Sequence, residues 1–422
     1  MSGKFFQCNR LVSFFFIVLL TLLFISCEDQ IIDPQTATGN DDRNALSAVQ
    51  TERSADYVEG TLPSGAIYRI YMADDWNGDL VVFAHGYVSA LEPVKIPEDQ
   101  LQIPDGTSIP ELVNDLGYAF ATTSYRYNGL IVADAIMDLV ELVYQFNDLY
   151  PDAGRVYLVG ASEGGLITVR TVERFKTIFS GGLALCGPIG DFGKQIDYLG
   201  DFRVIFDYFF PGILPGNAIE IPIEVQENWE TVYVPRIIRA ISADPQSVLE
   251  LLRVTGAPFD PADETTIGQT VLGLLWYNVF ATNDARRKLE GNPFDNMDRR
   301  YHGSSDDARL NRLVQRFQAD EAALRKISAE METSGKPRLP LVTMHTMGDE
   351  IVPGWHQRMY KTKVRESGYF RLHDSIPVVR YGHCNFTTDE VLDGFALLIL
   401  KVTAQELLPP TPDVYTFSRE LK

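Results

Sequence analysis

A serine between two glycines stands where it could act as a nucleophile. Residues 160–164 read Gly-Ala-Ser-Glu-Gly, the pattern G-x-S-x-G. The apolar residues 156–159 before this pattern favour a buried strand, and residues 166–169 after it favour the start of a helix. Glycines at both ends of such a turn allow it to be sharp, so that the serine hydroxyl is raised towards a neighbouring base. The pattern therefore predicts nucleophilic catalysis by Ser162.

Acyl transfer through a serine also needs N–H donors for the oxyanion of the tetrahedral intermediate. A buried-strand pattern at residues 80–84 runs into His85-Gly86-Tyr87. The backbone N–H of Tyr87 is the candidate donor from this loop, and the backbone N–H of Glu163 is the candidate from the serine turn. A tight turn that only ends a strand, with His85 as a structural side chain, is the alternative.

A carboxylate that orients a histidine is expected in a loop at the end of a strand. The apolar residues 339–344 lead through His345 to Gly348-Asp349-Glu350. Asp349 is the first candidate for this carboxylate, and Glu350 is the second. An aspartate in an ordinary polar turn is the alternative.

Three of the six histidines follow Asp349 in the chain. His356 falls in a predicted helix over residues 354–360, and His373 falls in the loop before a predicted strand. Only His383 follows the end of a strand, at residues 376–381, and a helix is expected from Glu390 onwards. His383 is therefore the candidate general base.

The order Ser162, Asp349, His383 differs from the orders of the chymotrypsin and subtilisin classes and resembles that of the α/β-hydrolase family. The resemblance covers most of residues 57–407, apart from an insertion in the middle. It implies the α/β-hydrolase fold, an α/β class with a mostly parallel central sheet flanked by helices. It also implies a Ser162–His383–Asp349 triad, with Tyr87 and Glu163 as the oxyanion hole. No cofactor is expected, and no metal, because no His/Cys cluster has ligand spacing.

Length and hydrophobic patterning agree with one elaborated α/β domain. The chain has 422 residues and is 45% hydrophobic, which is enough for a large core. Apolar runs predict buried parallel strands, and a one-sided apolar pattern predicts the helix over residues 131–149. The expected strands lie at residues 80–84, 118–122, 156–159, 183–185 and 341–344.

The stretch between Ser162 and Asp349 is too long for one more strand and helix. We expect residues 57–189 and 337–410 to form the hydrolase core and residues 190–336 to form a mainly helical cap inserted into it. Within the cap, Asp244-Pro245 predicts a helix that Gly256 ends.

Two further features of this insertion lead to expectations. The spacing of Leu310, Leu313, Val314 and Phe317 predicts a helix with one apolar face. The aromatic residues of 201–211 fit either a substrate pocket or, as we prefer, packing between cap and sheet.

The N-terminal residues resemble a bacterial lipoprotein signal. Lys4 and Arg10 come before residues 11–25, which carry no charge and are too few for a comfortable transmembrane helix. The apolar run ends at Phe24-Ile25-Ser26-Cys27, where Phe24 occupies a position at which the family prefers leucine. The resemblance implies a signal peptide at residues 1–26, lipidation of Cys27 and a tether at residues 27–56.

This organisation predicts an extracytoplasmic, membrane-anchored lipoprotein of a bacterial envelope. Secretion after cleavage elsewhere and an uncleaved anchor are the alternatives. The formal net charge of −20 repels nucleic acid and anionic membranes, so no nucleic-acid partner is expected and the membrane would be reached through lipid.

Two cysteines remain for other roles. Cys8 lies in the signal and Cys27 at the lipidation site, which leaves Cys186 and Cys384. In an oxidising compartment these two can form a disulfide. Their spacing in sequence leaves both the bonded and the free state open.

Together these features predict a serine hydrolase that cleaves small-molecule or oligomeric carboxylic esters through an acyl-enzyme. A cap-bearing serine peptidase, similar to the prolyl oligopeptidase or proline iminopeptidase groups, is one alternative. A non-catalytic lipoprotein that binds a glycan or lipid on a hydrolase scaffold is another.

Overall fold

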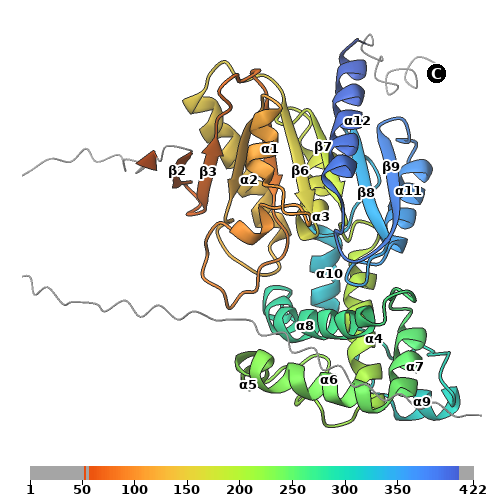
Figure 1. Cartoon of the computed structure of the whole chain (residues 1–422). Coiled ribbons are helices and arrows are strands. Elements are labelled where there is room, and N and C mark those ends of the chain that lie inside the picture. Colours follow the sequence, from red (N-terminus) through yellow and green to blue (C-terminus); the bar gives the residue numbers. More distant parts are fainter. Residues whose placement is uncertain (1–51, 54–56, 408–422) are drawn as a thin grey trace, which may run out of the picture. The chain divides into compact units, whose positions relative to one another are not determined.

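The computed structural model describes residues 52–53 and 57–407, drawn in colour in Figure 1. The predicted signal peptide, the lipidation site Cys27 and nearly all of the predicted tether lie outside these residues. Residues 52–53 correct one boundary, because they were expected in the tether but pair as a strand with residues 58–59.

The centre of the fold is one sheet of nine strands in the order β1-β2-β3-β5-β4-β6-β7-β8-β9. The first three strands are antiparallel to their neighbours, and the six strands from β5 to β9 along this order run parallel. The strands are β1 Glu52–Arg53, β2 Val58–Thr61, β3 Ile67–Tyr71, β4 Leu80–Ala84, β5 Ala119–Thr123, β6 Val156–Ala161, β7 Gly181–Leu185, β8 Leu341–Gly348 and β9 His373–Tyr381.

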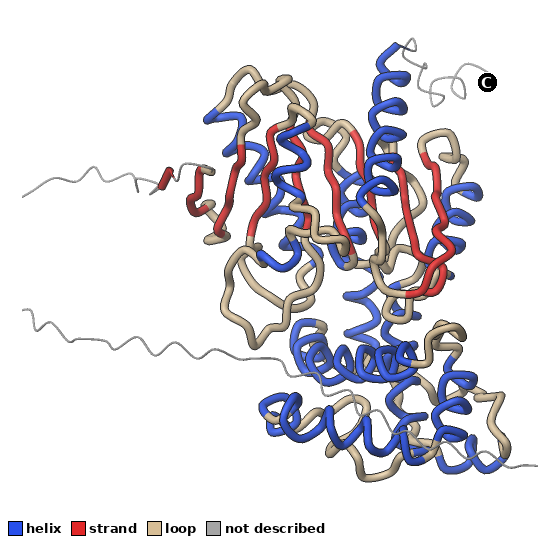
Figure 2. The backbone as a smooth tube through the Cα atoms, viewed as in Figure 1, coloured by secondary structure: helices blue, strands red, loops and turns tan. Residues whose placement is uncertain are grey.

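Helices cover both faces of the sheet, as expected where strands such as β4 are buried along their whole length (Figure 2). The helices of this layer are α1 Ile109–Asp115, α2 Val132–Leu149, α3 Glu163–Arg174, α11 Trp355–Glu366 and α12 Thr388–Leu407, with a short 3-10 helix η1 at Glu98–Gln100. One face packs against α1 and α12, through Val81, Leu183, Val113 and Leu398 among others. The other face packs against α2, α3 and α11, through Val82, Leu139, Ile167 and Tyr360 among others. The sheet and its two helical layers form the α/β-hydrolase fold, which confirms the fold class expected from the sequence.

Between β7 and β8 the chain forms a helical cap with a hydrophobic core of its own. Its helices are α4 Phe192–Phe209, α5 Ile223–Glu227, the π-helix η2 Trp229–Tyr233, α6 Val234–Ala243, α7 Pro245–Thr255, α8 Thr265–Lys288, α9 Asp307–Leu313 and α10 Glu321–Glu330. The side chain of Asp244 accepts a hydrogen bond from the N–H of Ser247 at the start of α7, and Gly256 ends the helix with a φ of 67°. Three hydrogen bonds join the cap to the rest of the fold, which we call the sheet domain. They are donated by the hydroxyl groups of Tyr87, Tyr198 and Tyr381 to backbone carbonyls across this boundary.

Two expectations about local structure are wrong. Helix α9 ends at Leu313, which is 55% exposed, and Val314 takes an extended conformation. Val314 is nevertheless buried. The apolar spacing therefore indicates which residues are buried, but the helix does not continue through them. His373 does not lie in a loop but is the first residue of β9, where its Nε2 is 2.9 Å from the hydroxyl of Thr343.

The aromatic residues 201–211 belong mostly to α4 and pack inside the cap. Phe202 and Phe206 are fully buried in the hydrophobic core of the cap, together with Ile351 and Val352 from the loop after β8. They join the cap to this loop rather than to the face of the sheet.

A search of the described residues for a long, apolar helix that would cross a membrane finds none.

Candidate active site

Ser162 occupies a sharp turn between β6 and α3. Its φ of 59° and ψ of −123° lie where non-glycine residues rarely occur, and such a conformation costs on the order of 1–3 kcal/mol. The N–H of Ser162 donates to the carbonyl of Leu185 on the neighbouring strand at 2.9 Å. The strained turn is thus held by the sheet, and it places the serine at the carboxyl end of the central strands.

The two glycines of the motif are required by crowding. A Cβ atom on Gly160 would overlap the carbonyl oxygen of Gly164 and the hydroxyl of Thr168. A Cβ atom on Gly164 would overlap the carbonyl oxygen of Ala84 on β4. The helix that follows Ser162 can approach the sheet this closely only without side chains at both positions.

The structure brings the three predicted triad side chains together. The Nε2 atom of His383 lies 2.9 Å from Oγ of Ser162, and its Nδ1 atom lies 2.7 Å from Oδ2 of Asp349. Ser162 and His383 are 221 residues apart in the chain. The order hydroxyl, imidazole, carboxylate is the one that nucleophilic catalysis by serine requires.

Asp349 is held rigidly for its position beside the imidazole. Its side chain is fully buried, and its Oδ1 atom accepts hydrogen bonds from the N–H groups of Ile351 at 3.0 Å and Val352 at 2.7 Å. The carboxylate of Glu350, the second candidate, makes no hydrogen bond to the imidazole of His383 among the contacts of the described residues. The geometry therefore favours Asp349 as the partner of the histidine.

The other two histidines that follow Asp349 in the chain, His356 and His373, have structural contacts. His356 is buried in α11, where its Nδ1 accepts the N–H of Gly190 at 3.0 Å and its Nε2 lies 2.9 Å from Oε1 of Gln195. His373 contacts Thr343 at the far end of β9. Neither imidazole lies beside Ser162.

The charge of Asp349 sets the basicity of His383. Burial lowers the pKa of His383, but the charge and hydrogen bond of Asp349 and the charge of Glu350 together raise it by more. The net effect holds the pKa of His383 above its ordinary value of 6.5. The imidazole is consequently a stronger base than a free histidine.

The loop His85-Gly86-Tyr87 passes directly beside Ser162. A Cβ atom built on Gly86 would lie 3.0 Å from Cβ of Ser162, so a larger residue there would have to displace the loop or the serine by a few tenths of an ångström. Neither the N–H of Tyr87 nor that of Glu163 has an acceptor in the described parts of the protein. Two free donors on either side of the serine suit an oxyanion.

The side chain of Glu163 faces away from the serine. It is buried, and its Oε1 accepts the N–H of Ile131 before α2 at 3.2 Å. Burial raises the pKa of Glu163 to about 7.

Cys186, directly after β7, and Cys384, directly after His383, are joined by a disulfide with Cα atoms 5.3 Å apart. Both have positive φ, 46° and 51°. These two sulfurs and His383 also form the one group of three potential metal ligands found among the described residues. Because the sulfurs are bonded to each other, they are not available as thiolate ligands.

One side chain of the site comes from the cap and was not found from the sequence. Tyr277 of α8 lines the same cavity as Ser162 and His383. Burial raises the pKa of Tyr277, and a hydrogen bond to Ser162 acts in the opposite direction. No sequence signal distinguishes Tyr277, since it lies within an apolar helix beside Trp276.

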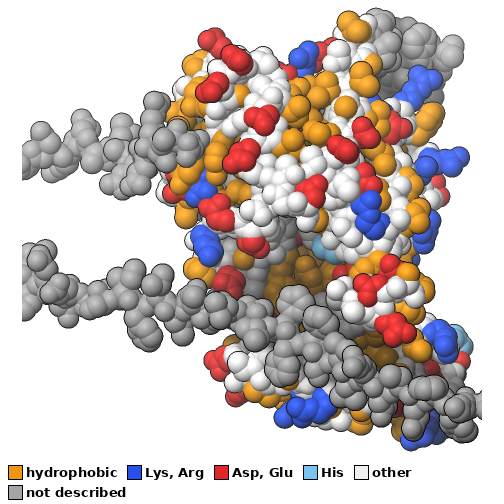
Figure 3. Space-filling model, viewed as in Figure 1, with side chains coloured by type: hydrophobic (Ala, Val, Ile, Leu, Met, Phe, Trp, Pro, Cys, Tyr) orange, Lys and Arg blue, Asp and Glu red, His pale blue; other side chains and the backbone are white. Residues whose placement is uncertain are grey.

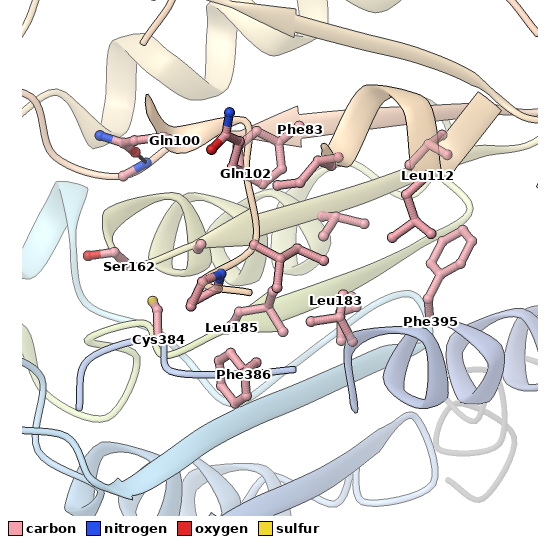
Figure 4. Close-up of a pocket in the computed structure, with 18 of the residues that line it drawn as sticks. Phe83, Gln100, Gln102, Leu112, Ser162, Leu183, Leu185, Cys384, Phe386 and Phe395 are labelled. Atoms are coloured by element: carbon pink, nitrogen blue, oxygen red, sulfur yellow. Dashed lines mark hydrogen bonds between the residues drawn. The ribbon is translucent and has the colours of Figure 1, made fainter. Parts of the chain in front are cut away.

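Two cavities meet at the loop of residues 85–87, and both are lined by Tyr87 and Gln100. The first has a volume of about 280 Å³ and extends from Ser162 into the sheet domain (Figure 4). The second, about 560 Å³, lies between residues 87–100 and the cap, and Trp229 and Trp276 are among its lining residues. Figure 3 shows one face of the molecule hollowed between sheet domain and cap, with hydrophobic side chains in the hollow.

The comparisons with known proteins give matches to solved structures alone. No model of a protein family matches the sequence, and no curated protein matches it. An esterase from Pyrococcus furiosus is 13% identical with a TM-score of 0.41, covering 88% of this chain and 97% of that one. Feruloyl esterase B from Aspergillus oryzae is 13% identical with a TM-score of 0.44, covering 84% and 80%. An acylaminoacyl peptidase from Pyrococcus horikoshii is 11% identical with a TM-score of 0.39, and its match covers 87% of this chain but 43% of the peptidase. The chain thus spans less than half of that peptidase.

Proposed function

We propose that the protein is a serine hydrolase that cleaves carboxylic esters through a covalent acyl-enzyme. The observation that carries the proposal is the continuous contact from Ser162 Oγ through His383 to Asp349, at 2.9 and 2.7 Å. The strained turn at Ser162 and the two free N–H groups beside it support the same chemistry.

In the first half of the reaction, Nε2 of His383 takes the proton of Ser162 as Oγ attacks the ester carbonyl carbon. The carbonyl electrons move onto oxygen, which accepts hydrogen bonds from the N–H groups of Tyr87 and Glu163. The C–O bond to the alcohol then breaks, and the alcohol leaves with the proton from His383. In the second half, water replaces the alcohol, the same proton transfers repeat, and the acid departs from a restored Ser162.

The lining of the cavity beside Ser162 favours an ester over an aminoacyl substrate. A peptidase that acts on a free amino terminus needs a carboxylate to bind the ammonium group. No aspartate or glutamate stands among the described residues that line this cavity. A neutral acyl group fits it better than a charged aminoacyl group.

The proposal is tested with p-nitrophenyl esters and aminoacyl anilides offered to the wild type and to Ser162→Ala and His383→Ala. We expect ester turnover in the wild type, loss of about 10³-fold or more in each variant, and no further loss when the two are combined. A fluorophosphonate probe should label the wild type and not Ser162→Ala. Anilide turnover that exceeds ester turnover would favour the peptidase alternative. Failure of the probe and of every substrate would favour a binding protein.

We also propose that the protein is an extracytoplasmic lipoprotein of a bacterial envelope, anchored through Cys27. The disulfide between Cys186 and Cys384 supports an oxidising compartment, where such bonds persist. Metabolic labelling with a fatty acid should give a labelled protein in the membrane fraction, and Cys27→Ser should abolish the label. Secretion of an unlabelled wild type would contradict the anchor.

A further inference from the structure

We infer that the acyl portion of the substrate is an uncharged hydrocarbon chain of medium length, which lies inside the sheet domain beneath α1 and α12 rather than under the cap. This inference rests on the proposed ester hydrolysis and names the substrate class for it.

The sheet itself forms the floor of the cavity. Alternate residues of the central strands face it, since neighbours two apart along a strand lie on the same face. Ala161 and Leu185 lie level with the end of the strands near Ser162, and Phe83, Val159 and Leu183 lie two residues further back. Two residues of strand correspond to about 6.6 Å, so the cavity leads away from the hydroxyl along the strands.

The opposite wall comes from the helices that cover this face. Leu112 of α1 and Phe395 of α12 line the cavity, as does Phe386 in the segment before α12. Figure 4 shows Ser162 and Cys384 at one end of the cavity, and Leu112 and Phe395 at the other. A chain bonded to Ser162 therefore has one direction in which to extend.

The residues that line the first cavity suit a hydrocarbon acyl chain. None of the described residues in the lining is Asp, Glu, Lys or Arg, so a charged acyl group would lose its hydration without gaining a partner. A cavity of about 280 Å³ has room for roughly nine groups the size of a water molecule, whose share of liquid volume is about 30 Å³, and a methylene group is of similar size. Burial of each methylene should raise kcat/KM about fourfold until the cavity is full.

The second cavity suits the alcohol. The acyl group stays on Ser162 through the first half of the reaction, whereas the alcohol must leave. The second cavity shares Tyr87 with the first and has charged groups in its lining, including Lys95, Asp99 and Glu230. A polar leaving group and the incoming water can be accommodated there.

The experiment varies the acyl and alcohol chains separately. For p-nitrophenyl esters of two to twelve carbons, wild-type kcat/KM should rise about fourfold per methylene and level off near eight carbons. For alkyl acetates with lengthening alcohols, we expect changes of less than about tenfold over the same range.

Two variants change the far end of the cavity in opposite directions. Leu112→Trp fills it and should lower the ratio of kcat/KM for octanoate over acetate at least about tenfold. Phe395→Ala enlarges it and should move the optimum to longer chains. Met137→Trp is the matched control, because Met137 lies on α2, against the other face of the sheet, and is 46% exposed. In Met137→Trp the ratio of kcat/KM for octanoate over acetate should equal that of the wild type.

The outcomes separate this inference from the proposed function. A wild type that the fluorophosphonate probe labels at Ser162, but with a flat acyl-chain profile, would overturn the cavity assignment alone. An unchanged ratio in folded Leu112→Trp, or a preference for long alcohols over long acyl chains, would overturn it as well. If Leu112→Trp does not fold, the test is Phe395→Ala. An optimum at longer acyl chains than in the wild type supports the inference, and an unchanged or shorter optimum overturns it. Absence of both labelling and turnover would instead overturn the proposed function.

Discussion

Gln100 holds the backbone of Gly86 beside the nucleophile. Its Oε1 accepts the N–H of Gly86 at 2.7 Å, and its Nε2 donates to the carbonyl of Tyr87 at 3.3 Å. One amide therefore fixes both peptide groups around the proposed N–H donor. Catalysis through such donors depends on their being fixed before the charge develops.

We expect Gln100→Ala to lower kcat about 10- to 100-fold with a smaller change in KM, because the donor of Tyr87 would lose its support. Steady-state kinetics on a short-chain ester measures the effect. Gln102→Ala is the matched control, since Gln102 lines the same cavity but makes no side-chain hydrogen bond to the loop within the described residues. Equal kcat in the two variants would show that Gln100 does not position the donor.

The pH profile should report the pKa of His383. The base must be neutral to accept a proton from Ser162, so kcat/KM should fall as pH decreases through this pKa. Because Asp349 and Glu350 together hold the pKa of His383 above 6.5, the half-maximal point should lie above pH 6.5. Stopped assays in buffers of constant ionic strength measure the profile.

Asp349→Asn should lower kcat by roughly 10⁴-fold, because the histidine loses both its orientation and the compensating charge. The acidic limb of the remaining activity should move to lower pH. Glu350→Gln is the control, since this carboxylate contributes to the pKa of His383 only through its charge. A Glu350→Gln loss as large as that of Asp349→Asn would contradict the assignment.

The disulfide should stabilise both the fold and the histidine loop. Cys186 and Cys384 are 198 residues apart, and removal of a native disulfide commonly costs about 2–4 kcal/mol. We expect Cys384→Ser to lower the melting temperature by several degrees and to lower kcat. Cys186→Ser should behave alike, because it removes the same bond. Unchanged melting temperatures, measured by calorimetry, would indicate that the two thiols are free.

Glu163 should make stability depend on pH. Its folded pKa is about 7, against 4.5 for the free side chain, so the folded state prefers the protonated form. The stability from this group is fully present below pH 4.5 and is lost as pH rises through about 7, by up to about 3 kcal/mol.

Glu163→Gln keeps an uncharged side chain of similar size and should remove this loss. Urea unfolding at pH 5 and pH 7.5 should therefore show a smaller decrease in stability for the variant than for the wild type. Burial also raises the pKa of Asp201, to about 6. Asp201 therefore lowers the stability of both proteins by the same amount between the two pH values, and its effect cancels in the comparison. Parallel decreases in the two proteins would show that Glu163 is charged throughout.

Much of the fold follows from local patterns. Buried parallel strands need apolar side chains on both faces, and so the runs at β4 and β6 stand out in the sequence. The turn at Ser162 stands out because its glycines are fixed by close contact. His383 could be selected among the histidines because a general base needs a position at the end of a strand.

Other features depend on packing that no local pattern encodes. Tyr277 reaches Ser162 because of how α8 lies against the sheet domain, and its neighbours in sequence look like any apolar helix. The apolar spacing predicts a longer helix than α9, because Val314 and Phe317 keep this spacing after the helix has ended. The cavity beside Ser162 arises where α1 and α12 leave the sheet face incompletely filled.

The two ends of the cap meet at one point of the sheet domain. The hydroxyl of Thr333, where the chain returns from the cap, donates to the carbonyl of Ile189, where the chain enters it, at 2.7 Å. Since β7 and β8 are adjacent strands, more than a hundred residues are inserted across a single short gap. Such an arrangement lets evolution lengthen, shorten or exchange the inserted module while the strands on either side keep their register, so a new substrate range can arise without redesign of the scaffold that holds the nucleophile.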